Sequence, residues 1–204
     1  MVLKAKKIII GLVVIILVVV AAVALISMLR IGIPQPLVEE FEPDLGDTNF
    51  GDWTANSDVP ADPNNPGSSV QWHIRRVSNV SRSGNHSAEF FIDGRQDDGT
   101  IWLERKINVL PNAQVRFTLS FFFYSEQESF NTLAAIVAYA GSAEPATEED
   151  FTVIGNANEV AGWKNYVFNP TLNTDSSGEA YVALGISVRW ETYMTYYIDD
   201  IVID

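Results

Sequence analysis

The feature that most constrains this chain is an uncharged apolar run near its start, residues 8–29. At about 1.5 Å of rise per residue, a helix over this run spans roughly 33 Å, enough to cross a hydrocarbon core about 30 Å thick. Lys4, Lys6 and Lys7 precede the run, and Arg30 follows it closely. Because basic residues favour the cytoplasmic side, the pattern predicts a single-pass membrane protein with a cytoplasmic N-terminus and an extracellular C-terminal domain.

A cleavable signal peptide is the alternative interpretation of the same run. Residues 22–24, Ala-Val-Ala, have the small side chains of a cleavage site. Secretory apolar segments are usually about 7–15 residues long, however, whereas this run continues through Leu29. We therefore predict an uncleaved anchor. The expected parts are a basic tail over residues 1–7, a transmembrane helix over 8–29, a proline-containing stalk over 30–37 and an outer domain over 38–204.

Charge is unevenly distributed along the chain. It has 13 lysines and arginines against 26 aspartates and glutamates, and four of the basic residues precede Ile31. The outer domain therefore carries nine basic and 26 acidic residues, a net charge of −17. This charge disfavours nucleic acid and anionic lipid headgroups as partners and is compatible with divalent cations. The absence of cysteine excludes thiol catalysis and cysteine metal sites.

Beyond the stalk, the sequence has the pattern of β-strands separated by turns. The expected strands are rich in Val, Ile, Phe, Tyr, Trp and Thr. In one of them Val115, Phe117, Leu119 and Phe121 alternate with polar residues, which predicts one buried face. No helical periodicity stands out here, so we predict an all-β, two-sheet antiparallel sandwich. The expected strands are residues 38–42, 69–77, 86–93, 100–109, 114–125, 131–141, 151–154, 163–169, 179–190 and 194–203.

Four short segments of the outer domain, taken in order, resemble a known family. They are Val-Glu-Glu-Phe-Glu at residues 38–42, Ser-Gly-Asn-His-Ser-Ala-Glu-Phe at 83–90, Gly-Trp-Lys-Asn-Tyr at 162–166 and Tyr-Tyr-Ile-Asp-Asp-Ile-Val-Ile at 196–203. This order resembles the jelly-roll carbohydrate-binding modules of the galactose-binding-like type, and it is similar to the MAM-like domains of cell-surface proteins. MAM domains of animal receptors carry cysteines, which this chain lacks. The resemblance to a microbial module implies a jelly-roll sandwich that binds glycan.

Such modules commonly hold a structural calcium ion where the first and last strands meet. The resemblance implies that Glu42 and Asp200 are ligands and that the turn at residues 83–86 adds backbone carbonyls. Glu40 lies two residues before Glu42 and would share its face of a strand. Calcium takes six to eight oxygen ligands, and clustered carboxylates supply them. We therefore expect a structural calcium site at Glu40, Glu42 and Asp200, the alternative being acidic residues at a solvated strand edge.

No catalytic motif occurs in the sequence. It lacks a Gly-x-Ser-x-Gly elbow, a His-Glu-x-x-His helix and a phosphate-binding glycine loop, so we expect no enzyme activity. Sugar rings stack their apolar C–H faces on aromatic side chains, most of which belong in the core of a sandwich. Trp190 and Tyr193 stand in a polar hairpin, and Trp72 lies beside polar residues. These three residues are the ligand-binding candidates.

The sequence thus favours a membrane-anchored extracellular binding module that recognises a glycan or a cell-surface protein. A second hypothesis is a structural subunit of a cell-envelope layer or surface filament, which would associate with copies of itself through a sheet edge. A third is a hydrolase with an unrecognised pair of carboxylates.

Overall fold

A computed structural model describes residues 16, 18–20, 36–42, 46–96 and 98–204. The chain divides into two compact units, Met1–Gly32 and Ile33–Asp204. The predicted cytoplasmic tail, most of the predicted membrane helix and nearly all of the predicted stalk lie outside the described residues. The few described residues of the first unit are helical. Within the described part of the chain, no helix has the length and apolar character that a membrane span requires.

The second unit consists of β-strands joined by loops and two single-turn 3-10 helices, which confirms the predicted all-β class. The strands, in chain order, are β1 (Leu37–Glu39), β2 (Thr54–Asp58), β3 (Trp72–Val77), β4 (Ser87–Asp93), β5 (Thr100–Asn108), β6 (Gln114–Arg116), β7 (Leu119–Ser125), β8 (Ala134–Gly141), β9 (Thr152–Asn156), β10 (Gly162–Phe168), β11 (Thr171–Asn173), β12 (Glu179–Val188) and β13 (Tyr193–Ile203). The two 3-10 turns are Gly94–Gln96 and Glu148–Asp150.

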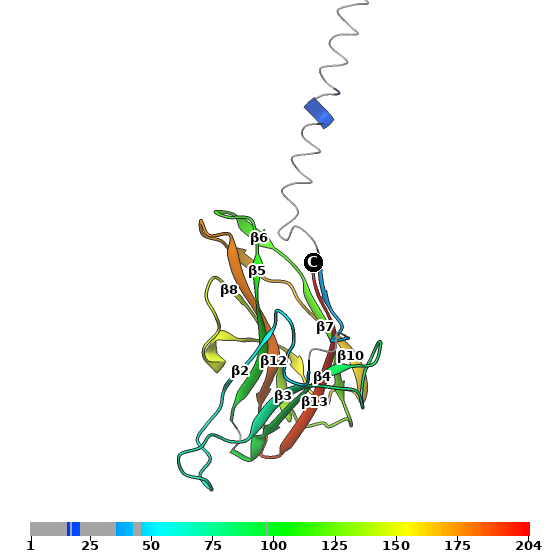
Figure 1. The fold of residues 1–204 in the computed structure, drawn as a ribbon, viewed down its shortest axis with the longest axis vertical. Helices are drawn as coiled ribbons and strands as arrows, with labels where there is room; N and C mark the ends of the chain where they lie inside the picture. The colour runs from blue at the N-terminus through cyan, green and yellow to red at the C-terminus, as the bar shows by residue number, and fades with distance from the viewer. Residues whose placement is uncertain (1–15, 17, 21–35, 43–45, 97) are drawn as a thin grey trace, which may run out of the picture. The chain divides into compact units, whose positions relative to one another are not determined.

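These strands form the predicted two-sheet antiparallel sandwich (Figure 1). One sheet has the order β10-β7-β13-β4-β3, with β1 added along β13. The other has the order β2-β5-β12-β8-β9, and β11 pairs with β6 as a separate ribbon. Except for β3 with β4 and β8 with β9, the neighbours in the two sheets are not consecutive in the chain, so residues far apart in the chain meet on each face.

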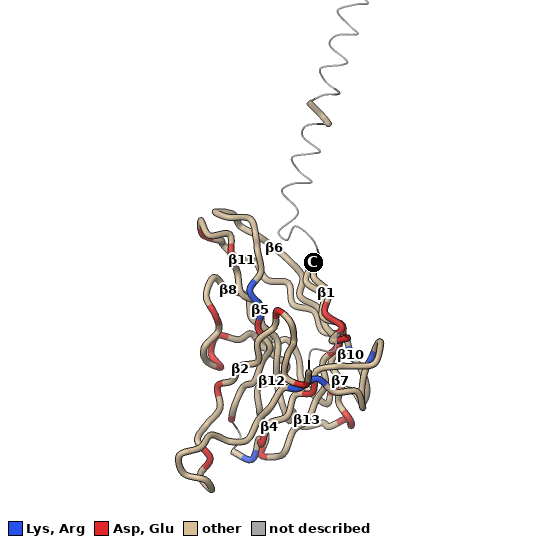
Figure 2. The backbone as a smooth tube through the Cα atoms, in the orientation of Figure 1, with Lys and Arg blue, Asp and Glu red and all other residues tan. Residues whose placement is uncertain are grey.

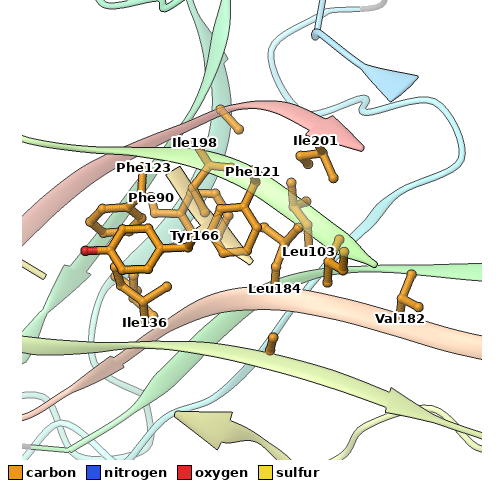
Figure 3. Packing of buried hydrophobic residues seen from close by; sticks show 14 of the residues in the cluster. Phe90, Leu103, Phe121, Phe123, Ile136, Tyr166, Val182, Leu184, Ile198 and Ile201 are labelled. Atoms are coloured by element: carbon orange, nitrogen blue, oxygen red, sulfur yellow. The ribbon is translucent and has the colours of Figure 1, made fainter. Parts of the chain in front are cut away.

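The core lies between the two sheets (Figure 3). Phe90 and Phe121 from the six-stranded sheet pack with Leu103 and Leu184 from the five-stranded sheet, and all four are fully buried. Burying a side chain of this size contributes about 1.5–3 kcal/mol, so the core supplies most of the driving force for folding. The predicted alternation is confirmed, because all of its apolar members are buried: Val115, Phe117, Leu119 and Phe121.

Two features of the fold differ from the expected strands. The predicted strand at residues 114–125 is divided into β6, which pairs with β11, and β7, which pairs with β10 and β13. Thr118 between them exchanges two backbone hydrogen bonds with Asp204, at 2.7 and 2.9 Å, which continue the pairing of β7 with β13. The expected strands also omit β2 and β11. Both are short and polar, and each pairs with a single neighbour.

Candidate functional site

The most exposed aromatic side chains of the domain lie at one end of the sandwich. Among the described residues, three aromatic side chains are more than a third exposed: Phe130 is fully exposed, Trp190 is 54% exposed and Tyr193 is 56% exposed. Large apolar groups at the surface are common when scattered, but several together indicate an interaction site. This end is therefore the first candidate for binding a ligand.

Two neighbouring loops carry these three rings. Residues 126–133 join β7 to β8, and residues 189–192 join β12 to β13. The N–H of Arg189 donates to the carbonyl of Leu133 at 2.9 Å, which ties the loops together. Tyr193 is the first residue of β13 and follows the second loop directly. We call these two loops together with Tyr193 the aromatic end.

The two predicted ligand-binding residues at this end have different surroundings. The Tyr193 ring lies 6.2 Å from Phe91 on β4, Phe91 lies 4.9 Å from His73 on β3, and each pair of rings is 19° from parallel. The guanidinium of Arg95 lies 4.6 Å from the Tyr193 ring centre. Trp190 makes no ring–ring or cation–ring contact with any described residue. Trp190 is therefore a half-exposed ring without an aromatic or cationic neighbour, whereas the Tyr193 ring lies beside both Phe91 and Arg95.

Trp72, the third predicted ligand-binding residue, has a different position. It is the first residue of β3, where side chains alternate between the core and the outer face of the sheet. Ile74 is buried in the core, and Trp72, on the same face, packs partly buried against the core. Trp190 and Tyr193 are therefore the solvent-exposed members of the predicted set.

The five-stranded sheet carries a tryptophan on its outer face that is not accessible. Trp102 on β5 alternates with the core residues Ile101 and Leu103, so its side chain points away from the core. It is nevertheless 0% exposed. The ring of Phe151 lies 5.0 Å from it. Phe151 ends a segment, residues 142–151, that crosses this face and that we call the strap.

Glu148 fastens the strap to the sheet. Its N–H donates to the Asp58 carboxylate on β2 at 2.9 Å, and its own carboxylate accepts hydrogen bonds from Arg189 at 2.8 Å and Thr100 at 3.3 Å. Burial alone would raise the pKa of Glu148, but the hydrogen bonds, above all that of Arg189, lower the pKa below its usual value. The strap is thus tied both to an edge strand and to the hairpin of the aromatic end.

An open polar cavity of about 260 Å³ lies beside the strap on the same face. Tyr181 on β12 supplies its aromatic ring, and the Lys106 ammonium lies 5.7 Å from the centre of that ring. Lys106 also pairs with Glu179 at 2.8 Å, which raises the pKa of the lysine. None of these residues was predicted as a site from the sequence, because their proximity depends on the pairing of β5 with β12. The cavity is lined by Asp52, Thr54, Glu104, Lys106, Glu144 and Tyr181.

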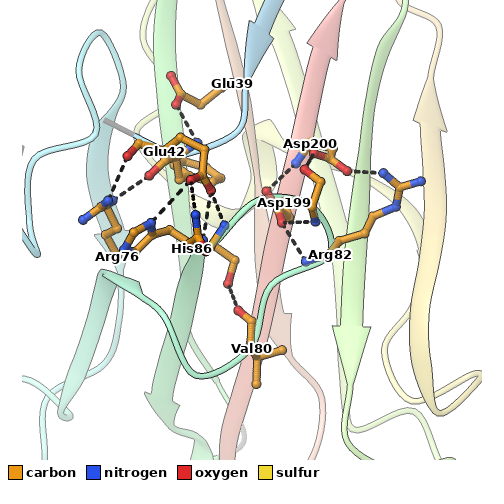
Figure 4. A network of polar contacts seen from close by, with 12 residues as sticks. Glu39, Glu42, Arg76, Val80, Arg82, His86, Asp199 and Asp200 are labelled. Atoms are coloured by element: carbon orange, nitrogen blue, oxygen red, sulfur yellow. Dashed lines mark hydrogen bonds and ion pairs between the residues drawn. The ribbon is translucent and has the colours of Figure 1, made fainter. Parts of the chain in front are cut away.

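A second polar cluster holds the loop between β3 and β4, residues 78–86, which we call the clasp loop (Figure 4). Glu42, just beyond β1, accepts the N–H groups of Asn85 at 2.7 Å and His86 at 3.0 Å. The hydrogen bond from Asn85 is the main reason that the pKa of Glu42 is lowered. Gly84, directly before these donors, has a φ of 55°, and a Cβ there would collide with the Glu42 carboxylate. The contact between the Glu42 carboxylate and the clasp loop therefore requires glycine at position 84.

Two adjacent aspartates of β13 hold the other part of the clasp loop. Asp199 is 0% exposed and accepts the N–H groups of Arg82 at 2.8 Å, Ser83 at 3.2 Å and Asp200 at 2.8 Å. Burial raises the pKa of Asp199 to about 6, although these hydrogen bonds oppose the shift. Asp200 accepts the hydroxyl of Ser83 at 2.5 Å and pairs with the Arg82 guanidinium. The clasp loop thus joins the start of the domain to its last strand.

The structure brings the predicted calcium ligands together only in part. Glu42 and Asp200 both contact the clasp loop, whereas Glu40 is exposed. Phe41 has a φ of 57°, which breaks the strand alternation expected to place Glu40 and Glu42 on one face. In the part of the chain that the structure describes, no three acidic or histidine side chains are grouped to hold a metal ion. These side chains alone do not fit a calcium ion, so the calcium site stays a prediction.

Comparisons with known proteins identify the fold. No protein-family model and no curated protein sequence match this chain. It is similar to a solved structure of carbohydrate-binding modules from the β-sandwich superfamily, whose description concerns the structural basis of their promiscuous specificity. The TM-score is 0.51, the sequence identity is 15%, and the match covers 81% of this chain and 60% of that chain.

Two further solved structures are similar. One is the K2 cleaved adhesin domain of Lys-gingipain, with a TM-score of 0.50 and 15% identity over 83% of this chain and 99% of that chain. The other is a carbohydrate-binding module, TmCBM61, in complex with β-1,4-galactotriose, with a TM-score of 0.47 and 12% identity over 77% of this chain and 90% of that chain. At such low identity the matches define the fold alone. This chain therefore has the β-sandwich fold found in carbohydrate-binding modules.

Proposed function

We propose that the domain is a non-catalytic glycan-binding module whose ligand contacts Trp190 and Tyr193. The observation that carries this proposal is the exposure of these two rings, with Phe130, at one end of the sandwich. The sandwich fold shared with carbohydrate-binding modules supports it. The absence of a catalytic motif from the sequence agrees with binding without chemistry.

Trp190 is the main platform in this proposal. A sugar ring lays its apolar C–H face on an aromatic face and directs its hydroxyls towards polar groups at the edge. Trp190 is 54% exposed and has no aromatic or cationic neighbour, and the nearby Tyr193 carries a hydroxyl. Arg95, beside Tyr193, is fixed by two hydrogen bonds to Asp93, at 2.5 and 2.7 Å, and adds further polar groups. The aromatic end thus offers one ring for stacking and an ordered polar edge.

The test is isothermal titration of the full chain in zwitterionic lipid nanodiscs with soluble xylan, galactan and glucan. Trp190→Ala is expected to weaken binding of whichever polysaccharide binds by about tenfold, the equivalent of about 1.4 kcal/mol. Tyr181→Ala, in the cavity beside the strap, is the matched control and is expected to bind like the parent protein. Loss of binding in Tyr181→Ala alone would place the ligand in that cavity. No binding by the folded parent protein to any glycan would overturn the proposal.

We further propose that the module is displayed outside the cell on its N-terminal segment. The uncharged run and the lysines before it support this topology. The chain has no cysteine, so single introduced thiols report their location without background. Ser176→Cys is expected to react with a membrane-impermeant maleimide on intact cells, whereas Val2→Cys reacts only after lysis. Labelling of both variants, or of neither, on intact cells would contradict this topology.

A further inference from the structure

The acidic residues around the aromatic end set the chemistry of its ligand. Glu126 and Glu128 belong to the loop that carries Phe130, and Glu191 follows Trp190 directly. All three carboxylates are exposed, and none forms an ion pair with a cation in the described part of the chain. Their negative charge therefore faces solvent at the same end as the exposed rings.

The cations near this end do not neutralise those carboxylates. Arg189 pairs with Glu148 of the strap, and Arg95 pairs with Asp93. Lys164 on β10 pairs with Glu159. Each of these cations already has a carboxylate of its own, so the three exposed acids leave the aromatic end with an excess of negative charge.

The rest of the domain reinforces this charge. Figure 2 shows acidic residues over many of its loops and strands and few basic ones, as expected from a net charge of −17 after Ile31. A field of one sign raises the local concentration of oppositely charged ligands and repels those of like sign. A glycan rich in uronic acid or phosphate would therefore be repelled from this surface.

We propose that the ligand is a polysaccharide of amino sugars bearing free, protonated amines, an inference that rests on the proposed glycan-binding function. Such a polymer presents apolar sugar-ring faces and positively charged amines, and the aromatic end can bind both. The apolar face of each sugar ring stacks on Trp190, and ammonium groups at the ring edge pair with Glu126, Glu128 and Glu191. An N-acetylated polymer retains the first contact and loses the second, because acetylation removes the charge.

The expected advantage follows from the strength of exposed ion pairs. A solvent-exposed pair contributes little, roughly a two- to fivefold gain in affinity for each carboxylate engaged. Two or three pairs at once therefore give an advantage of about tenfold or more for the deacetylated ligand. Because these pairs are exposed, salt must reduce the advantage, since the screening length falls to about 3 Å at 1 M ionic strength.

The experiment compares a fully deacetylated chitosan hexamer with its N-acetylated counterpart, using the full chain in zwitterionic nanodiscs. The titrations are run in mildly acidic buffer, in which the amines of the deacetylated hexamer are protonated. The deacetylated hexamer is expected to bind at least about tenfold more tightly at low salt, and the difference is expected to shrink at high salt. Polygalacturonate, an anionic polymer, is expected not to bind.

Variants assign this preference to the aromatic end. The combined variant Glu126→Gln, Glu128→Gln, Glu191→Gln is expected to lose the preference while it keeps its affinity for the acetylated hexamer. Glu144→Gln with Glu149→Gln, two exposed carboxylates of the strap, is the matched control and is expected to keep the preference. Trp190→Ala is expected to weaken binding of both hexamers.

The outcomes separate this inference from the proposed function. Equal affinity for the two hexamers, or tighter binding of polygalacturonate, overturns the amino-sugar inference and leaves glycan binding in place. A preference that survives the triple glutamine variant overturns the assignment to the aromatic end. Binding of poly-lysine as tight as that of chitosan, with no effect of Trp190→Ala, means that any polycation is attracted. Binding of no glycan by the folded protein overturns the proposed function itself.

Discussion

The clasp loop and the aromatic end lie at opposite ends of strand β4 and are built from opposite kinds of contact. At the clasp loop, Glu42 and the buried Asp199 accept hydrogen bonds from backbone N–H groups. At the other end, β4 finishes beside Tyr193, and apolar rings face water. A loop held by charged acceptors is fixed in one conformation, whereas exposed rings remain free to contact a ligand. The comparison separates a structural end of the domain from a candidate recognition end.

The largest effect on stability is expected at the clasp loop. Asp199→Ala should lower the free energy of unfolding by about 4 kcal/mol, because three backbone N–H groups lose their acceptor. Urea unfolding followed by tryptophan fluorescence measures this change. Glu144→Ala, which removes an exposed carboxylate of the strap, is the control and should change the free energy by less than about 0.5 kcal/mol. Equally small effects of both variants would contradict a structural role for this contact.

Calcium is the next test of the same end. If the predicted ion binds, calcium at 100 times its Kd should raise the free energy of unfolding by about 2.7 kcal/mol over a chelator-treated sample. Thermal melts in calcium and in chelator compare the two states. Asp200→Ala should abolish the difference, and Glu40→Ala tests whether an exposed carboxylate takes part. Identical melts of the parent protein in calcium and in chelator would mean that calcium does not stabilise the clasp loop.

A pH test addresses Glu89, which lies on β4 between the two ends. Its carboxylate accepts hydrogen bonds from Arg75 at 2.7 Å and His73 at 3.1 Å. Burial would raise the pKa of Glu89, but these two partners lower it below 4.5. The ionised form therefore stabilises the fold above the unfolded-state pKa, and this contribution is lost as the pH falls from about 4.5 through the folded-state pKa.

Glu89→Gln should cost about 1.5 kcal/mol at neutral pH, the size of a charged hydrogen bond. The variant should also lose stability less steeply than the parent protein as the pH falls below about 4.5. Urea unfolding at a series of pH values checks both statements. Parallel curves for the two proteins would mean that Glu89 titrates alike in the folded and unfolded chains.

The smallest effect on stability is expected at the aromatic end. Phe130→Ala should change the free energy of unfolding by less than about 0.5 kcal/mol, because a fully exposed ring loses no buried contact. The melting temperature should be unchanged for the same reason. A decrease of several kcal/mol in the free energy of unfolding would show that this end is part of the packed structure. The aromatic end would then not differ from the clasp loop in its role in stability.

Strands with strong apolar alternation could be predicted from the sequence, and others could not. The expected strand at residues 86–93 corresponds to β4, Ser87–Asp93, because Ala88, Phe90 and Ile92 alternate along it and are buried in the core. The strand β2, Thr54–Asp58, has a sequence of small and polar residues and is a strand only because β5 pairs with it. Edge strands of this kind depend on a partner far along the chain, which local patterns do not reveal.

The accessibility of aromatic residues was predictable only where local polarity decided it. Trp190 stands in a short polar hairpin and is exposed as expected. Trp102 points to the outer face of its sheet, yet the strap covers it. The cavity around Tyr181 likewise arises from strands that are distant in sequence. The burial of Trp102 and the cavity around Tyr181 both depend on which segments pack on the outer face of the sheet. Patterns in a single sequence do not reveal that packing.

The pairing of β1 with the far end of β13 has a consequence for how the domain is made. Leu37 lies opposite Ile203, so one of the first strands to be synthesised finds its partner in the last. Strand β13 also separates β4 from β7, so the six-stranded sheet stays in two pieces until β13 has been synthesised. At roughly 5–20 residues per second, β1 waits on the order of ten seconds for its partner. During that interval the growing chain exposes unpaired strand edges. A chaperone or a wrong strand can then occupy the place of β13.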